Sequence, residues 1–119
     1  MHQHEKLNYI EMAAQNLGAT KIFFSAVFGW VFEDFGPEYT AFSGEGLDGG
    51  FYKVDAFTRQ ALAPLVVFYS ADLESTLKKV VDAGGVVSKP TFTFPGGQRF
   101  HFIEPSGNEL AVWSDLASE

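Results

Sequence analysis

The feature that most limits how this chain can fold is a pattern that repeats after 56 residues. In each copy, an alternating apolar segment leads to a polar residue suited to cap a helix, Asn16 in the first copy and Asp72 in the second. Gly29 and Gly85, residues that favour the end of a helix, follow at the same offset. We interpret the repeat as an internal duplication, and a chance likeness of two short αβ units is the alternative.

Each copy predicts one helix and four strands in the order β-α-β-β-β. The strands are expected at residues 7–13, 30–35, 39–43, 51–54, 65–69, 86–90, 98–103 and 109–113. Half of the chain is too small to bury its own sheet face. We therefore predict one α+β domain over residues 1–119, in which two βαβββ modules (about 5–55 and 63–115) form a curved mixed sheet, an incomplete barrel with the helices outside.

Apolar side chains recur with helical spacing after both capping residues. The expected apolar faces are Leu17, Ile22, Phe23, Ala26 and Val27 in the first helix, and Leu73, Leu77, Val80 and Val81 in the second. We expect the core to include Ile10, Phe23, Val66, Phe68, Leu77 and Val80. Two glycine-containing segments, 44–50 and 92–97, are predicted as loops, and the second would expose Phe92 and Phe94.

The net charge of the chain limits the classes of partner that it can bind. Fifteen Asp and Glu residues against eight Lys and Arg give a net charge of −7, whereas nucleic-acid binders carry a basic patch and anionic membranes repel an acidic protein. No apolar run approaches the roughly 18 residues of a transmembrane helix, and the polar start predicts no secretory leader. Without cysteine there is no disulfide, thiolate zinc site or cysteine nucleophile. We expect a cytoplasmic protein with a small-molecule ligand and no nucleic-acid or membrane partner.

Three segments of the two modules resemble a known family. The likeness lies in residues 8–11 with 16–17 and 24–30, in residues 65–69 with 72–73 and 83–85, and in residues 100–110. The last segment is similar to a strand-turn-strand hairpin of the vicinal oxygen chelate superfamily, with Glu104 where that family usually has Asp. The superfamily includes glyoxalase I, fosfomycin-resistance and bleomycin-resistance proteins and extradiol dioxygenases. The resemblance extends over residues 7–114 and implies the fold rather than one reaction.

The resemblance also implies where a metal would be held. Metal enzymes of the superfamily take ligands from equivalent strands of the two modules, and those positions are Tyr9, Leu65 and Ala111 here, with a fourth near Phe51. Leucine and alanine have no donor atom, and a neutral tyrosine is a poor ligand for manganese, nickel or zinc. The family's metal site is therefore expected to be lost, with no metal and no cofactor. A displaced site built from Glu11, Glu109 and His101 is the alternative.

Strand parity predicts which side chains face a ligand. Residues two apart in a strand share one sheet face, and the resemblance implies that one member of each pair lines the cavity. The predicted ligand-binding residues are Tyr9, Glu11, Val67, Tyr69, Arg99, His101, Ala111 and Trp113. A β-bulge near Gly97 or Glu104 would invert the strand that carries Arg99 and His101. In a purely structural alternative, His101 is hydrogen-bonded within the sheet and Arg99 pairs with Glu109 or Glu11.

These residues and the resemblance are compatible with two functions of different classes. The first is a metal-independent, bleomycin-resistance-like homodimer that binds a small aromatic or carbonyl-bearing anionic ligand, with Trp113 or the region of Phe92 in the dimer contact. The second is an enzyme, either a lactoylglutathione-lyase-like lyase or isomerase, or a dioxygenase-type enzyme with a displaced metal. A structural partner of another protein is a third possibility. His101 and a carboxylate are suited to general acid–base chemistry, but no catalytic residue is assigned. His2 and His4 are expected in a solvated tail.

Overall fold

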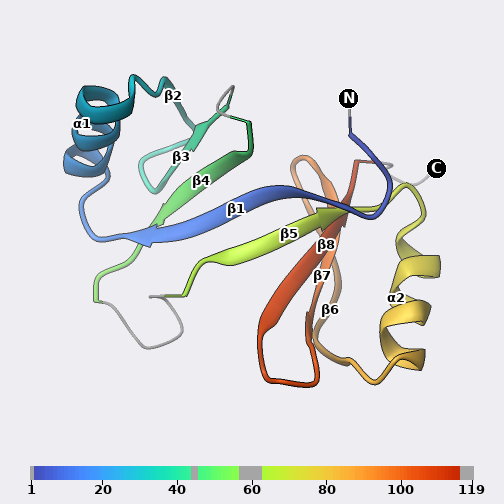
Figure 1. The fold of residues 1–119 in the computed structure, drawn as a ribbon. Coiled ribbons are helices and arrows are strands. Elements are labelled where there is room, and N and C mark those ends of the chain that lie inside the picture. The colour runs from blue at the N-terminus through green and yellow to red at the C-terminus, as the bar shows by residue number, and fades with distance from the viewer. Residues whose placement is uncertain (1, 44–45, 57–62, 116–119) are drawn as a thin grey trace. The chain divides into compact units, whose positions relative to one another are not determined.

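The computed structural model describes residues 2–43, 46–56 and 63–115. The chain divides into two compact units, an N-terminal unit of residues 9–65 and a C-terminal unit of residues 66–119 together with residues 1–8. Both units have the order strand, helix and three strands, so the duplication inferred from the sequence is confirmed as a repeated βαβββ topology (Figure 1). How the two sheets combine into the expected incomplete barrel stays a prediction.

The two units repeat the same strand order. The N-terminal unit contains β1 (Lys6–Ala14), α1 (Leu17–Phe28), β2 (Phe32–Asp34), β3 (Tyr39–Phe42) and β4 (Asp48–Lys53). Its strands lie in the order β2-β3-β4-β1, with β1 parallel to β4 and the other pairs antiparallel. The C-terminal unit contains β5 (Leu65–Tyr69), α2 (Leu73–Asp82), β6 (Val86–Phe94), β7 (Gly97–Ile103) and β8 (Glu109–Ser114). Its order is β6-β7-β8-β5, with β5 parallel to β8.

The helices begin where the capping residues predict. Asn16 accepts a hydrogen bond from the backbone N–H of Ala19 at 2.9 Å, and Asp72 accepts one from Ser75 at 3.2 Å. Gly29 ends α1 in the left-handed conformation, with φ of 74°, which a residue with a side chain adopts only at a cost. These local signals determine where α1 and α2 begin and where α1 ends.

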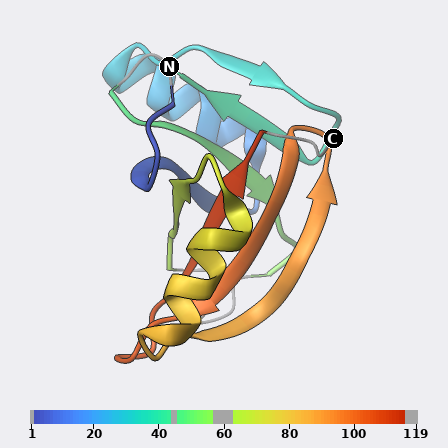
Figure 2. The same cartoon turned by 90° about the vertical axis from the view of Figure 1, so that its right-hand side faces the viewer.

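Each helix covers one face of its own sheet. In the N-terminal unit, the buried residues Ala14, Phe42 and Phe51 are packed by half-buried side chains that include Phe24 of α1 and Trp30. In the C-terminal unit, α2 lies along the face that carries the second core (Figure 2). That core consists of Leu73, Phe100 and Val112, packed by Phe68, Leu77, Val80 and Phe102.

The predicted core is confirmed for four residues and wrong for one. Ile10, Phe68, Leu77 and Val80 pack against the two cores, while Val66 is only half-buried. Phe23 is 55% exposed, because the side of α1 that faces the sheet carries Leu17 and Phe24 instead. Both sides of this helix are apolar, so periodicity alone selected the wrong one.

Both predicted loops are partly strand. β4 begins at Asp48 and includes Gly49 and Gly50, which the segment 44–50 was expected to leave in a loop. Residues 92–94 belong to β6, and only Pro95 and Gly96 connect it to β7, so the region is a tight hairpin rather than an open loop. Among the described residues, no helix is long and apolar enough to cross a membrane. A cytoplasmic location stays a prediction.

Candidate functional site

Six of the predicted ligand-binding residues share one face of the C-terminal sheet. Directly opposed residues project to the same side of a sheet. The register opposes Arg99, Trp113 and Tyr69 in one row across β7, β8 and β5, and His101, Ala111 and Val67 in the next row. The intervening residues, such as Phe100 and Val112, point to the opposite side and pack under α2. We call the side with the two rows the ligand face, after the prediction that these residues bind a ligand.

No bulge interrupts the pairing of β7 with β8, so the inversion considered from the sequence does not occur. Pairing of β7 with β8 runs in unbroken register from Gln98 to Ile103. The register shifts fall in β6 instead, between Val87 and Phe92. Arg99 and His101 therefore keep the orientation that parity predicted.

His101 is buried on the ligand face, with a residue exposure of 4%. Its Nδ1 lies 3.2 Å from Oε2 of Glu109. Because a carboxylate only accepts hydrogen bonds, Nδ1 carries the ring proton and Nε2 is left as an acceptor. Nε2 is buried and has no hydrogen-bond partner among the described residues. Burial above all, followed by the nearby Arg99 guanidinium, lowers the pKa of His101, so the imidazole is neutral at pH 7.

Arg99 lies among aromatic rings. Its guanidinium carbon is 5.5 Å from the ring centre of Phe92 and 5.8 Å from that of Phe94, within cation–π range. The Phe94 ring lies 6.2 Å from Trp113, which meets Tyr69 edge-on at 5.2 Å. The ligand face thus combines the Arg99 guanidinium and a neutral imidazole with several aromatic rings.

The N-terminal residues, expected in a solvated tail, contact this same face. The His2 ring lies 4.9 Å from Tyr69 and 5.0 Å from Trp113. Trp113 Nε1 donates a 2.8 Å hydrogen bond to Asn8, and His4 Nδ1 accepts one from the backbone of Ala71. His2 and His4 are exposed, as predicted, but they are not a free tail. Their contacts join residues far apart in the sequence, which local polarity does not reveal.

The other two predicted residues, Tyr9 and Glu11, form a cluster within the N-terminal unit. The Tyr39 hydroxyl donates to Glu11 at 2.9 Å and lies 2.6 Å from the Tyr9 hydroxyl. Burial and the adjacent Glu11 carboxylate raise the pKa of Tyr39, so it stays protonated and acts as the donor. Gly50 lies directly beneath the two tyrosine hydroxyls. Tyr9 also lines a cavity of about 310 Å³ in this unit.

The side chains at the superfamily's metal positions do not fit a metal ion. Ala111 and Leu65 have no donor atom, and the Tyr9 hydroxyl is held by Tyr39. In the part of the chain that the structure describes, no group of three or more His, Cys, Asp or Glu residues is placed to hold a metal. Of the proposed displaced site, Glu109 and His101 contact each other, whereas Glu11 accepts a hydrogen bond from Tyr39 in the N-terminal unit.

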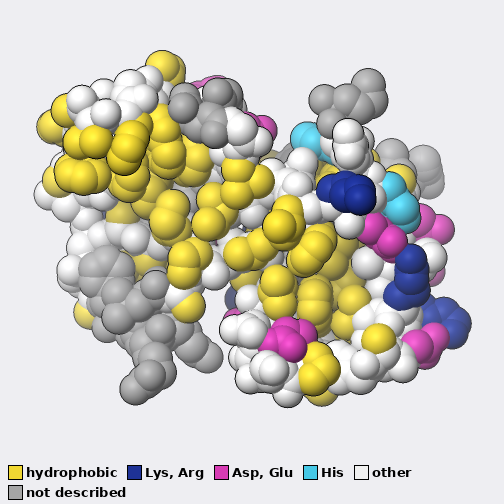
Figure 3. Space-filling model, viewed as in Figure 1, with side chains coloured by type: hydrophobic (Ala, Val, Ile, Leu, Met, Phe, Trp, Pro, Cys, Tyr) yellow, Lys and Arg dark blue, Asp and Glu magenta, His cyan; other side chains and the backbone are white. Residues whose placement is uncertain are grey.

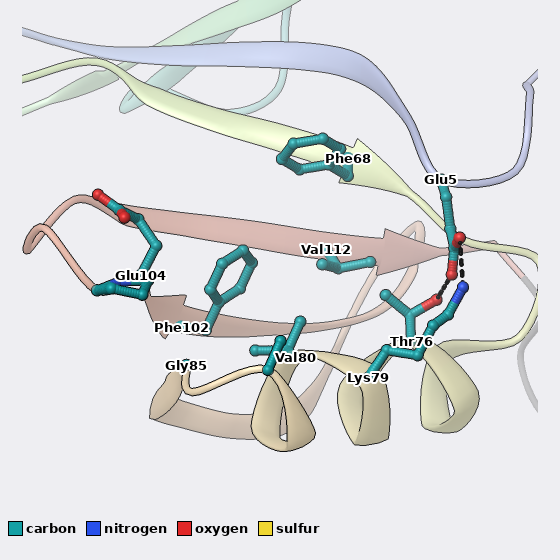
Figure 4. A pocket seen from close by; sticks show the side chains of 11 residues that line it. Glu5, Phe68, Thr76, Lys79, Val80, Gly85, Phe102, Glu104 and Val112 are labelled. Atoms are coloured by element: carbon teal, nitrogen blue, oxygen red, sulfur yellow. Dashed lines mark hydrogen bonds and ion pairs between the residues drawn. The ribbon is translucent and has the colours of Figure 1, made fainter.

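A second hollow lies on the helix side of the C-terminal sheet (Figure 4). Its volume is about 350 Å³, and Val80 of α2 faces Phe102 and Val112 across it. Glu5 closes one end, where its carboxylate accepts hydrogen bonds from Lys79 and Thr76, both at 2.8 Å. These contacts, led by the Lys79 bond, lower the pKa of Glu5. The charged side chains that line this hollow already have partners. The hollow therefore offers a ligand little beyond apolar contact.

Sequence reasoning missed Tyr39 and His2, and it placed Phe92 and Phe94 in a loop beside the cavity rather than in β6. A signal existed for the phenylalanines, since Phe92 and Phe94 are two apart and would share a face if the strand continued. Their segment contains Pro90 and ends at glycines, which favoured a loop. Tyr39 and His2 carry no local signal, because their partners come from other strands.

The family model described as the glyoxalase/bleomycin resistance protein/dioxygenase superfamily matches residues 6–112. "Putative glyoxylase CFP32" of Mycobacterium bovis and its namesake from Mycobacterium tuberculosis are each 26% identical over 123 residues. The alignment covers 89% of this chain and 44% of each relative, so the chain spans less than half the length of these curated relatives.

Solved structures with low sequence identity share the fold. A hypothetical protein, BH1468 from Bacillus halodurans, superposes with a TM-score of 0.78 at 10% identity, over 98% of this chain and 99% of that one. The Mn(II)-bound glyoxalase from Novosphingobium aromaticivorans gives 0.71 at 18% identity, over 98% of this chain and 41% of that one. A superfamily member from Vibrio splendidus gives 0.67 at 15% identity, over 92% and 99%. At such identities the likeness supports the fold and leaves the ligand open.

Proposed function

Since the chain belongs to the glyoxalase/bleomycin resistance protein/dioxygenase superfamily, we propose that it is a metal-independent binding protein for a small anionic molecule with an aromatic ring or a carbonyl group. The ligand lies on the ligand face of the C-terminal unit, against Arg99 and His101. The side chains of this face support the proposal, because the fold alone accommodates many functions.

The observation that carries the proposal is the Nε2 atom of His101. It is buried and without a hydrogen-bond partner among the described residues, while Glu109 holds the other ring nitrogen. Leaving a buried polar atom unsatisfied costs about 1–3 kcal/mol, so such atoms are rare unless a ligand or water satisfies them. As an acceptor, Nε2 selects a ligand with a hydroxyl or N–H donor.

The surroundings of His101 define the rest of the ligand. The Arg99 guanidinium supports binding of a carboxylate or other anion, through a charge-assisted hydrogen bond. The rings of Phe92, Phe94 and Trp113, which are less buried than Tyr69, support apolar contact with a flat group. Metal independence is supported by the lack of donors at Leu65 and Ala111.

A lyase or isomerase is the second candidate, and the pair His101–Glu109 favours it. A neutral imidazole oriented by a carboxylate is suited to accept a proton from a bound substrate. An enzyme of this kind would lose turnover in His101→Asn while the Arg99 contact still binds substrate. A binding protein would lose only affinity.

The test is calorimetric titration of EDTA-treated protein with 3-phenyllactate, which carries an aromatic ring, a hydroxyl donor and a carboxylate. We expect Arg99→Ala to weaken binding about 10- to 150-fold, the equivalent of the roughly 1.5–3 kcal/mol of a charged hydrogen bond. Lys78→Ala is the matched control, because it removes the same charge from an exposed site on α2 and should leave affinity unchanged.

The uncharged analogue 3-phenyl-1,2-propanediol separates the anion contact from general apolar binding, and it should not distinguish Arg99→Ala from the parent. A variant with a lower melting temperature and unchanged affinity for 3-phenyllactate would instead give Arg99 a structural role. Affinity that disappears with EDTA and returns with a transition metal would contradict metal independence.

A further inference from the structure

The hollow on the helix side of the C-terminal sheet is a space that the core does not fill. Its volume is about 350 Å³, whereas protein interiors leave few spaces larger than a water molecule. Phe68, Val80 and Phe102 line it and are only half-buried, although they pack against the core. Figure 3 shows hydrophobic side chains at the surface on this side of the C-terminal unit, next to charged ones. The apolar walls of the hollow are therefore open to solvent.

In the N-terminal unit, aromatic rings fill the corresponding space between helix and sheet. The ring of Phe24 on α1 stacks on Trp30 at 4.7 Å and lies 5.4 Å from Phe51 on β4. Trp30 stacks in turn on Phe42 at 4.1 Å. Phe42 and Phe51 are each only 4% exposed, so these four rings cover the helix side of the N-terminal sheet.

Three of these four aromatic positions carry valine in the C-terminal unit. The 56-residue offset and the register of the parallel strand pairs identify the counterparts, which are Val80 for Phe24, Val86 for Trp30 and Val112 for Phe51. Valine is smaller than either aromatic side chain and has no ring. Val86 is also 63% exposed, so it does not cover the sheet as Trp30 does. The hollow therefore lies where the duplicated unit holds aromatic rings of its own.

We propose that the hollow is a second small-molecule site, on the opposite side of the sheet from the ligand face, and that it binds a flat, uncharged aromatic compound of one or two rings. The bound rings take the place that Phe24 and Trp30 fill in the N-terminal unit, against Val80, Phe102 and Val112 (Figure 4). An apolar cavity of about 150 Å³ admits benzene, so about 350 Å³ has room for two fused rings.

The charged side chains around the hollow favour an uncharged ligand. At one end, the Glu5 carboxylate accepts a hydrogen bond from Lys79 at 2.8 Å. At the other end, the Glu104 carboxylate accepts bonds from the backbone N–H of Ser106 at 2.9 Å and from that of Asn108 at 3.3 Å. These bonds, led by those from Lys79 and Ser106, lower the pKa of both carboxyl groups, so both stay ionised. The two carboxylates repel an anion, and a cation would have to compete with their present partners.

The first test is an NMR titration of the unaltered protein, labelled at its valine methyl groups, with naphthalene. The methyl signals of Val80 and Val112 should shift until binding saturates. Val67 is the internal control, because it lies on the ligand face of the same sheet and should shift much less. The absence of a saturable shift at Val80 and Val112, as expected if a protein side chain covers the hollow instead, would overturn the proposal. An equal or larger shift at Val67 would also overturn it.

The matched probe 2-naphthoate tests the preference for an uncharged ligand. It carries the same two rings with a carboxylate, which Glu5 and Glu104 repel at the ends of the hollow. From the shifts of Val80 and Val112, we expect 2-naphthoate to bind in the hollow at least tenfold more weakly than naphthalene. Equal affinity of the two compounds for the hollow would contradict a site for uncharged rings.

The second test fills the hollow with a side chain. Val80→Phe restores the ring that Phe24 supplies in the N-terminal unit, so it should weaken naphthalene binding at least tenfold and raise the melting temperature. Val81→Phe is the matched control, because it makes the same change one residue along α2, at a side chain that is 48% exposed, and it should alter neither quantity. A folded Val80→Phe variant that binds naphthalene as tightly as the parent would overturn the proposal. The titration of the unaltered protein decides the question if this variant does not fold.

Discussion

Replacement of Gly50 by alanine tests the packing of the Tyr9, Glu11 and Tyr39 cluster. A Cβ atom on Gly50 would lie 2.1 Å from the Tyr39 hydroxyl and 2.7 Å from that of Tyr9, closer than atoms in proteins approach. Gly50 does not have the positive φ that penalises alanine, so the effect must come from displacing the tyrosines. Tyr39 is held by Glu11 and Tyr9 and cannot move without breaking hydrogen bonds.

The expected cost follows from those two bonds. The bond to the Glu11 carboxylate is worth about 1.5–3 kcal/mol, and the bond between hydroxyls about 1 kcal/mol. The smaller entropy of an unfolded chain with alanine returns about 0.4–1 kcal/mol. We expect a net loss of about 1.5–3.5 kcal/mol, which lowers the melting temperature by roughly 6–14 °C for a domain of this length.

The assay is urea unfolding, read by tryptophan fluorescence and circular dichroism. Gly18→Ala is the matched control, because the new Cβ would meet only Asn16 at 3.4 Å and should be neutral or slightly stabilising. In a Tyr39→Ala background, Gly50→Ala should reduce the free energy of unfolding by less than half as much, because the Tyr39 hydroxyl no longer opposes the new Cβ atom. An equal loss of stability with and without Tyr39 would show that Gly50 is not required to leave room for the Tyr39 hydroxyl.

Two further outcomes can be measured on the same instruments. Because its pKa is lowered in the folded state, His101 takes up a proton more readily when unfolded, so stability should fall as pH drops below about 6.5. His101→Asn should flatten that dependence between pH 7 and 5, and an unchanged slope would argue against a buried neutral imidazole. Phe100 is 0% exposed, and its replacement by alanine should lower the free energy of unfolding by about 3–5 kcal/mol. Phe100→Leu should cost clearly less, and equal losses would show that the α2 side of the sheet is not tightly packed.

Local chemistry predicted much of this fold. The capping residues Asn16 and Asp72 and the turn at Gly29 fix the ends of the helices, and their 56-residue offset identifies the repeated topology. Strand parity in β7 and β8 places Arg99 and His101 on one face because no extra residue interrupts their pairing. These signals act within a few residues and are readable from the sequence.

Other features could not be predicted from the sequence, because they depend on how the strands pair in the sheet. Pro90 argued against a long β6, but β6 is an edge strand, where a residue without an N–H is tolerated. The strand therefore continues and brings Phe92 beside Arg99. The side of α1 that meets the sheet was misjudged because both sides are apolar. The bond between Tyr39 and Glu11 depends on strand pairing that no local pattern reports.

The most direct test of the proposed function is the nitrogen NMR signal of His101 Nε2 in metal-stripped protein. His101→Asn assigns the signal among the three histidines of the chain. With saturating 3-phenyllactate, we expect the His101 Nε2 signal to move toward that of a hydrogen-bonded acceptor, while Nδ1 stays bound to Glu109. Phenylpyruvate in its keto form has no hydroxyl donor and should move the signal less. A His101 Nε2 signal unchanged by bound 3-phenyllactate would contradict the proposed role of His101 in ligand binding.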